Sequence, residues 1–244
     1  MTSDKDAGPT LLAIDTAGSA CSAAVGCGTH VLAAEREAMR YGHGEGLLPM
    51  IDRVMGVAAL PRAPLDGIAV TVGPGGFTGI RVGLGAAHGI ALALGIRLIG
   101  VTSFAAVAAS LPASPGITLV ALDSRRDDLY VQLFDRNTAE PLADPAAVLP
   151  AALAEYVAGL AGAGRLMVAG DAAESAAAAL SGQLPGQLNL EIAAGSAPDA
   201  PGVLAAALCQ IERDRFARPV HPLYLRPPDV TVPKRSLPIS AVRR

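Results

Sequence analysis

The sequence of 244 residues is poor in aromatic residues and in cysteine, with no tryptophan, four phenylalanines, four tyrosines and three cysteines. Because nucleic-acid bases stack on aromatic rings, so few of them argue against an extended base-stacking platform. Three cysteines without a Cys-x-x-Cys spacing are too few for a disulfide framework, and they fit a reducing compartment. The four histidines share no spacing typical of metal ligands, so we expect no bound metal.

Long hydrophobic runs are also missing, although 51% of the residues are hydrophobic. The longest uncharged helical stretch, residues 82–96, has 15 residues, whereas a membrane span needs about 20. The first ten residues contain Asp4 and Asp6 and no apolar core, so we expect no signal peptide. These observations predict a cytoplasmic protein without membrane contact.

Charge is sparse and unevenly distributed. The net charge is −3, but residues 213–244 contain eight basic residues and two acidic ones, so the rest of the chain is acidic. An acidic body argues against independent binding of nucleic acid, because attraction to phosphates supplies most of the affinity. We interpret the basic C-terminal segment as a solvated extension, with direct contact to RNA as the less favoured alternative.

Strand and helix patterns alternate along the chain and then start again. Three short strand patterns precede an amphipathic helix at residues 47–60, and a second, longer helix at residues 77–94 follows a glycine-rich loop. The pattern restarts near residue 112, where a strand ends in Asp123 as the first strand ends in Asp15. This predicts an α/β fold with mixed sheets and an internal repeat. The predicted parts are a lobe at 11–111, a second lobe at 112–216 and an extended tail at 217–244.

The glycine-rich loop between Gly73 and Gly79 follows a strand and opens a helix, the setting in which backbone amides bind anions. It is not a dinucleotide fingerprint, because no acidic residue follows about 20 residues on, and it lacks the lysine of a P-loop. We favour a structural role, in which glycine allows close packing, over contact with an anion or nucleotide. Asp15 is open to two readings, positioning of Mg²⁺ or phosphate and capping of its own turn. The candidate residues for an anion or nucleotide are Asp15, Thr16, Ser19, Gly73, Gly75, Gly76, Thr78 and Gly79.

No catalytic centre is evident. The sequence has no Gly-x-Ser-x-Gly motif and no cysteine–histidine pair or carboxylate pair in an obvious role. Five segments nevertheless resemble one known family, the bacterial TsaB (YeaZ) family, in order and spacing. They read LLAIDTAGSACSAAV, HGEGLLPMIDRVM, AVTVGPGGFTGIRVGLGAAHGIALALGIRLIGVTSF, LVALDSRRDDLYVQLF and PLYLRPPDV. The similarity is specific over residues 11–133 and returns at 222–226.

This resemblance implies an actin-like (ASKHA) duplicated two-lobe fold and a role in forming N6-threonylcarbamoyladenosine in tRNAs that read codons starting with A. It implies a subunit without catalysis of its own, which pairs with the catalytic paralogue TsaD, is joined by TsaE and reaches tRNA indirectly through the complex. It implies no cofactor of the chain's own, with ATP or ADP held only weakly or at the junction of the complex, and a homodimer when the chain is alone.

The resemblance also places the pairing surface on the two long helices of the first lobe. The candidate interface residues are Leu47, Met50, Ile51, Val54, Arg81, Gly85, Ala86, His88 and Gly89. Ser103 and Val107 stand where the paralogue has two metal-binding histidines, so no metal ligand carries over. The alternative function is an ATPase or phosphotransferase of the actin-like fold that acts on its own, using Asp15 and the glycine-rich loop.

Overall fold

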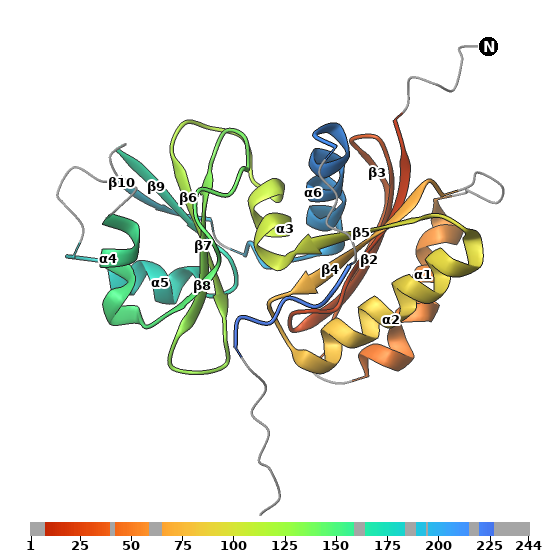
Figure 1. Cartoon of the computed structure of the whole chain (residues 1–244), viewed down its shortest axis with the longest axis horizontal. Helices are drawn as coiled ribbons and strands as arrows, with labels where there is room; N and C mark the ends of the chain where they lie inside the picture. The colour runs from red at the N-terminus through yellow and green to blue at the C-terminus, as the bar shows by residue number, and fades with distance from the viewer. Residues whose placement is uncertain are drawn as a thin grey trace, which may run out of the picture.

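The computed structural model describes residues 8–39, 42–58, 65–158, 164–183, 189–193, 195–214 and 220–226, and it has two lobes, each built on a five-stranded sheet (Figure 1). The first part of the chain forms β1 (Thr10–Asp15), β2 (Ala20–Cys27), β3 (His30–Ala38), α1 (His43–Val57), β4 (Gly67–Gly73), α2 (Phe77–Leu94), β5 (Arg97–Thr102) and α3 (Ser103–Ser110). The second part forms β6 (Ile117–Asp123), β7 (Leu129–Asp135), β8 (Ala146–Val148), a 3₁₀ turn (Pro150–Ala152), α4 (Leu153–Ala158), β9 (Arg165–Ala169), α5 (Ala173–Leu180), β10 (Asn189–Ile192) and α6 (Ala200–Glu212).

The two sheets share one topology. The strand orders are β3-β2-β1-β4-β5 and β10-β9-β6-β7-β8, which become the same when one of them is reversed. In each sheet the first strand, β1 or β6, is antiparallel to the next strand of the hairpin and parallel to the strand that follows the helical connection. The predicted α/β class, the mixed sheets and the internal repeat are confirmed.

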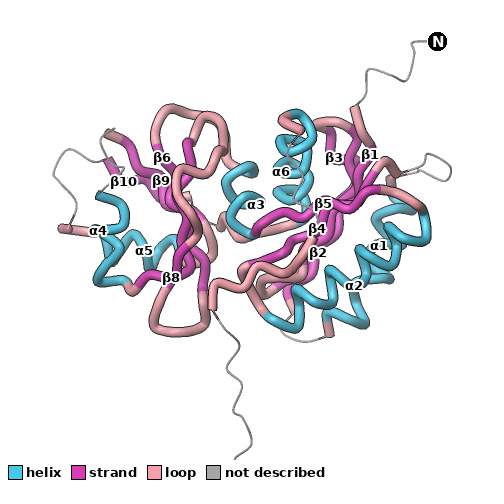
Figure 2. Tube along the Cα trace, in the orientation of Figure 1, coloured by secondary structure: helices cyan, strands magenta, loops and turns pink. Residues whose placement is uncertain are grey.

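Helices cover both faces of the first sheet (Figure 2). α1 and α2 pack on one face, around a core that includes Leu12, Ile14 and Val70. α3 and α6 cover the other face, where Val203 and Ala207 of α6 join Leu11 in a second core.

The position of α6 departs from the predicted lobe boundaries, because α6 falls within 112–216 by sequence but packs on the first sheet. The Ala200 amide at its start donates to Ser22 Oγ of β2 over 3.0 Å. An ideal Cβ on Gly202 would lie 2.5 Å from the carbonyl oxygen of Ala106 in α3, so glycine allows the two helices to touch. The driving force is burial of the apolar side of α6 on a sheet face that would otherwise be open.

The helix α2 is unusually apolar along its whole length. Within the described ranges, α2 alone is long and apolar enough to cross a membrane, and about a third of it is buried in the lobe. A single helix of this kind is weak evidence for a membrane span. Its partial burial instead leaves an apolar surface on the outside of the first lobe.

Residues 220–226, here called the strap, connect the two lobes in an extended conformation (Figure 1). On the first lobe, the Leu223 amide donates to the carbonyl oxygen of Val72 over 2.8 Å, and Val220 packs into the core. On the second lobe, the Arg226 guanidinium pairs with the buried carboxylate of Asp128. The predicted tail is therefore extended in this part, while residues 215–219 and 227–244 lie outside the described residues.

Candidate functional site

The glycine-rich loop between β4 and α2 packs directly against the end of β1. Ideal Cβ atoms on Gly75 and Gly79 would lie 2.3 Å from the Ala17 carbonyl oxygen and 2.0 Å from the Thr16 carbonyl oxygen. The Thr16 hydroxyl donates to the Gly79 carbonyl over 2.7 Å, and the Gly76 amide donates to Ala17 over 2.7 Å. Since a larger residue would push the two segments apart, this geometry supports the structural role of the loop.

Gly73, the first glycine of the loop, lies where the strap passes over the loop. Its φ of 108° is in the region that favours glycine. An added Cβ would also lie 2.8 Å from the Leu223 carbonyl oxygen of the strap. Gly73 therefore serves the turn and the strap and is not among the residues that line the two pockets described next.

A small pocket of about 220 Å³ lies between the two lobes at this loop. The first lobe contributes Ser19, Gly75 and Gly76, and the second lobe contributes Asp123 and Arg125 among others. An ideal Cβ on Gly76 would lie 3.8 Å from a guanidinium nitrogen of Arg125, so this cation reaches across to the loop. The volume is below the roughly 300–1,000 Å³ typical of small-molecule sites.

Asp171 lies on the second-lobe side of this pocket. Its Oδ1 accepts a hydrogen bond from the Asp123 amide over 2.9 Å. Burial raises the pKa of the Asp171 carboxyl, although the Asp123 amide opposes the shift. The side chain thus braces the end of β6 rather than projecting an unpaired charge toward the loop.

Asp15 is buried at the end of β1 and is not among the residues that line the pocket. Its Oδ1 accepts a hydrogen bond from the Ala17 amide over 3.2 Å, which is the turn-capping geometry. Burial raises the pKa of its carboxyl, although the Thr71 side chain and the Ala17 amide oppose the shift. The geometry supports the capping reading more than a role in holding Mg²⁺ or phosphate.

A second pocket, of about 300 Å³, adjoins the start of α2 and is lined by further candidate anion residues. Thr16, Gly76, Thr78 and Gly79 line it from the first lobe, and Arg125 lines it from the second. The two pockets together therefore gather six of the candidates, Thr16, Ser19, Gly75, Gly76, Thr78 and Gly79.

The candidate pairing residues of α1 are not on the surface. Leu47, Met50, Ile51 and Val54 are all buried in the core of the first lobe, so they cannot contact a partner in this conformation. Their spacing is that of the apolar side of a helix packed on its own sheet. This corrects the predicted interface.

The candidate residues of α2 lie differently. Arg81, Gly85, His88 and Gly89 are exposed, and Ala86 is half-buried. The exposed side also carries Leu92, which is 85% exposed and was not predicted. Leu48 and Val57 add exposed apolar groups on α1. The sequence offers a signal for these three residues, since they are apolar at positions on the polar side of an amphipathic helix.

The positions of the paralogue's metal ligands have structural roles here. The Ser103 hydroxyl is buried and donates to the Pro74 carbonyl over 2.7 Å, which ties α3 to the glycine-rich loop. Val107 belongs to a core cluster between the lobes. In the part of the chain that the structure describes, no three metal-ligating side chains come together.

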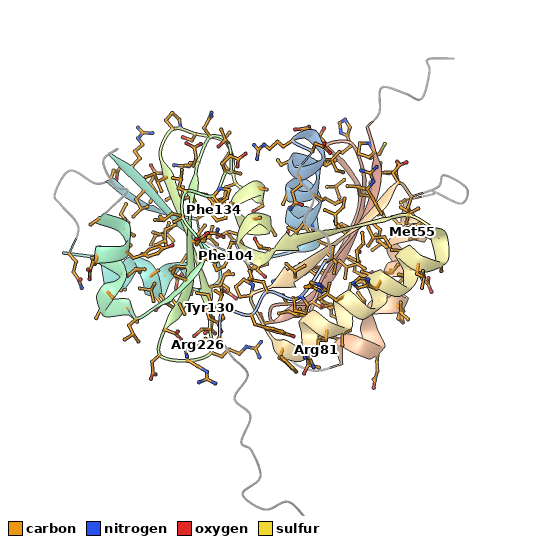
Figure 3. All side chains as sticks on the ribbon, in the orientation of Figure 1. Met55, Arg81, Phe104, Tyr130, Phe134 and Arg226 are labelled. Atoms are coloured by element: carbon orange, nitrogen blue, oxygen red, sulfur yellow. The ribbon has the colours of Figure 1, made fainter. Side chains whose placement is uncertain are left out.

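An aromatic cluster at the start of α2 escaped the sequence analysis. The rings of Phe77 and Tyr224 stack with centroids 5.5 Å apart, and the Arg81 guanidinium carbon lies 3.7 Å from the Phe77 centroid. Arg81 Nε also donates to the Tyr224 hydroxyl over 3.2 Å. Figure 3 shows Arg81 and Arg226 along the same edge of the molecule. No local pattern predicts this cluster, because it joins a helix to the strap near the other end of the chain.

Comparisons with known proteins match this chain to one family. A family model described as "TsaD: tRNA N6-adenosine threonylcarbamoyltransferase" matches residues 36–195. The tRNA threonylcarbamoyladenosine biosynthesis protein TsaB of Escherichia coli is 34% identical over 129 residues, which are 52% of this chain and 55% of that protein. The TsaB protein of Haemophilus influenzae is 36% identical over 126 residues, 50% of this chain and 52% of that protein. The chain thus spans about half the length of the curated relatives it matches.

Solved structures extend the similarity to the whole fold. YeaZ from Pseudomonas aeruginosa superposes with a TM-score of 0.74 and 27% identity, covering 89% of this chain and all of that one. A ROK hexokinase from Thermus thermophilus, with a TM-score of 0.53, 15% identity and coverage of 84% and 99%, shows the actin-like fold alone. The chain therefore belongs to the tRNA N6-adenosine threonylcarbamoyltransferase family, and the resemblance of its motifs to the TsaB (YeaZ) proteins is confirmed.

Proposed function

We propose that this chain is a non-catalytic subunit that pairs with TsaD, with TsaE joining the pair, to form N6-threonylcarbamoyladenosine in tRNAs that read codons starting with A. The names of its TsaB relatives and the family model support the process. In this role the complex brings tRNA to the transferase subunit, and the chain keeps that subunit competent.

The observation that carries the pairing is the exposed apolar side of α1 and α2. Leu92 and Val57 are exposed there, beside the exposed small residues Gly85 and Gly89. An ideal Cβ on either glycine would meet no atom within 4 Å, so a partner's helix can approach the backbone of α2 closely. Large apolar residues exposed on two helices that pack against each other are typical of interaction sites on soluble proteins. A paralogue with the same fold offers a matching pair of helices, and a second copy of this chain would do so in its absence.

The cleft between the lobes supports the absence of an independent nucleotide function. The pocket is small, Arg125 crosses it, and Asp15 is buried behind the loop. In this proposal ATP or ADP is held only weakly by the chain or at the junction with TsaD. The alternative, an independent ATPase or phosphotransferase, requires micromolar affinity for Mg-ATP that is lost on Asp15→Ala, and calorimetry measures both.

The direct test is light scattering after size exclusion, on this protein alone and mixed with TsaD from the same genome. A one-to-one heterodimer that replaces any homodimer is the expected result. Two unshifted peaks would refute the proposal and favour the independent enzyme.

A further inference from the structure

The two aromatic rings that the described part of the chain exposes lie together. Phe77 is 47% exposed and Tyr224 is 41% exposed, whereas Phe104 and Phe134 are buried. The pair is held rigidly, since the strap is fixed by Leu223 on one side of Tyr224 and by Arg226 on the other. A rigid exposed ring is a surface on which a flat ligand can stack at low entropic cost.

The pocket next to Phe77 is cationic. Its lining includes Arg125 and His43 but no aspartate or glutamate. Burial lowers the pKa of His43, and its Nε2 is buried without a hydrogen-bond partner in the described ranges, so this ring shapes the wall of the pocket and leaves Arg125 as its charged group. A pocket whose one charged group is a guanidinium suits a phosphate.

The surroundings extend this positive charge. Arg81 lies against Phe77, whereas Arg226, two residues after Tyr224, pairs with Asp128 of the second lobe. The 18 residues that follow, 227–244, contain four basic residues and one acidic residue. The net charge of −3 therefore hides a basic segment that follows the strap in the sequence. A stacking ring beside an arginine, with a basic segment following in the sequence, is a combination by which proteins bind single strands.

We propose that the strap and the start of α2 form a contact site for single-stranded RNA, with one base stacked on Tyr224 and a neighbouring phosphate held by Arg125. Unpaired bases such as those of a tRNA loop present the faces that this site needs, whereas an RNA duplex hides them. The site rests on the proposed function only in that pairing with TsaD brings tRNA to the complex. It adds a direct contact to RNA that composition alone argued against.

The test measures anisotropy of a fluorescein-labelled anticodon stem-loop RNA with the full-length chain, alone and paired with TsaD. Replacing the Tyr224 ring, in Tyr224→Leu, is expected to weaken RNA binding at least about fivefold, the lower range for loss of one stacked base. Tyr224→Phe keeps the ring and should bind as the parent does. Arg125→Gln should weaken binding and lower the slope of log affinity against log salt by about 0.7, the value for one phosphate on a single strand.

Matched controls separate this site from the pairing surface. Arg165→Gln removes an exposed arginine at the start of β9 in the second lobe, near the opposite end of β6 from Asp123, and should leave RNA binding unchanged. Circular dichroism melting checks that each variant is folded. Loss of pairing by Tyr224→Leu with unchanged RNA affinity would assign the cluster to the partner protein and overturn the proposal. Absence of RNA binding by the parent, alone and paired, would overturn it too, while a heterodimer in size exclusion would leave the proposed function standing.

Discussion

Asp15 is a single carboxyl group whose surroundings set a measurable dependence of stability on pH. Burial raises its pKa above the ordinary value of 3.8 in the folded protein. The folded state then keeps a proton that the unfolded state releases, so the free energy of unfolding falls as pH rises from about 4 through the raised pKa. Asp15→Asn lacks this loss and is expected to be more stable than the parent at neutral pH, by on the order of 1 kcal/mol, because its amide oxygen can still accept from Ala17 and a buried neutral amide costs less than a buried carboxylate.

Urea unfolding of both proteins at pH 4 and pH 7.5 measures this difference, which should shrink at the lower pH. Asp52→Asn, a change at an exposed aspartate of α1, is the matched control and should show no such trend. A variant less stable than the parent at pH 7.5 would contradict the argument, since it would mean that the Asp15 carboxylate is stabilised in the folded protein.

The helices show what local sequence patterns can and cannot establish. The apolar spacing of α1 predicts a helix and identifies its buried side, because the period of 3.6 residues is a local property. The same spacing cannot distinguish a side that faces the protein's own sheet from one that faces a partner, and Leu47 and Met50 were assigned to the wrong one. The residues of α1 that a partner could contact are instead Leu48 and Val57, apolar residues on its exposed side. The close contact between Gly79 and Thr16 was predictable only as a glycine-rich loop, because its partner is distant in sequence.

α2 supports a prediction about pairing. Gly85→Arg places a long charged side chain on the exposed side of α2, where no described residue beyond the helix's own adjoining turns comes within 4 Å of an ideal Cβ. Folding should survive, since arginine has a higher helix propensity than glycine. Affinity for TsaD is expected to fall roughly thirtyfold, about 2 kcal/mol, because a charge would be buried against the partner's apolar surface.

Calorimetric titration of TsaD with each variant gives the affinity. Ala178→Arg makes the same kind of change at an exposed position of α5 in the second lobe and should leave the affinity unchanged. Equal affinities for the parent and a folded Gly85→Arg protein would remove α2 from the pairing surface.

At the scale of the whole molecule, the strap joins parts that no sequence pattern connects. Its ion pair unites the last described residue, Arg226, with Asp128 in the turn between β6 and β7, where the Ser124 hydroxyl also donates to the carboxylate over 2.8 Å. The Asp128 side chain is 2% exposed. Removal of one partner of such a pair leaves a buried charge without compensation, which costs about 3–5 kcal/mol when the pair is fully buried.

Arg226→Gln is therefore expected to destabilise the protein by about 1–3 kcal/mol, less than that range because Arg226 itself is partly exposed and Ser124 still binds the carboxylate. Because Arg226 and the packing of Leu225 together anchor the strap on the second lobe, loss of the ion pair should loosen the strap, and the Leu223 amide, bonded to Val72, should exchange faster with solvent deuterium. Asp128→Asn removes the buried charge, so adding it to Arg226→Gln should recover part of the lost stability. Purely additive effects in this double-mutant cycle, or unchanged exchange at Leu223, would show that the ion pair does not hold the lobes together through the strap.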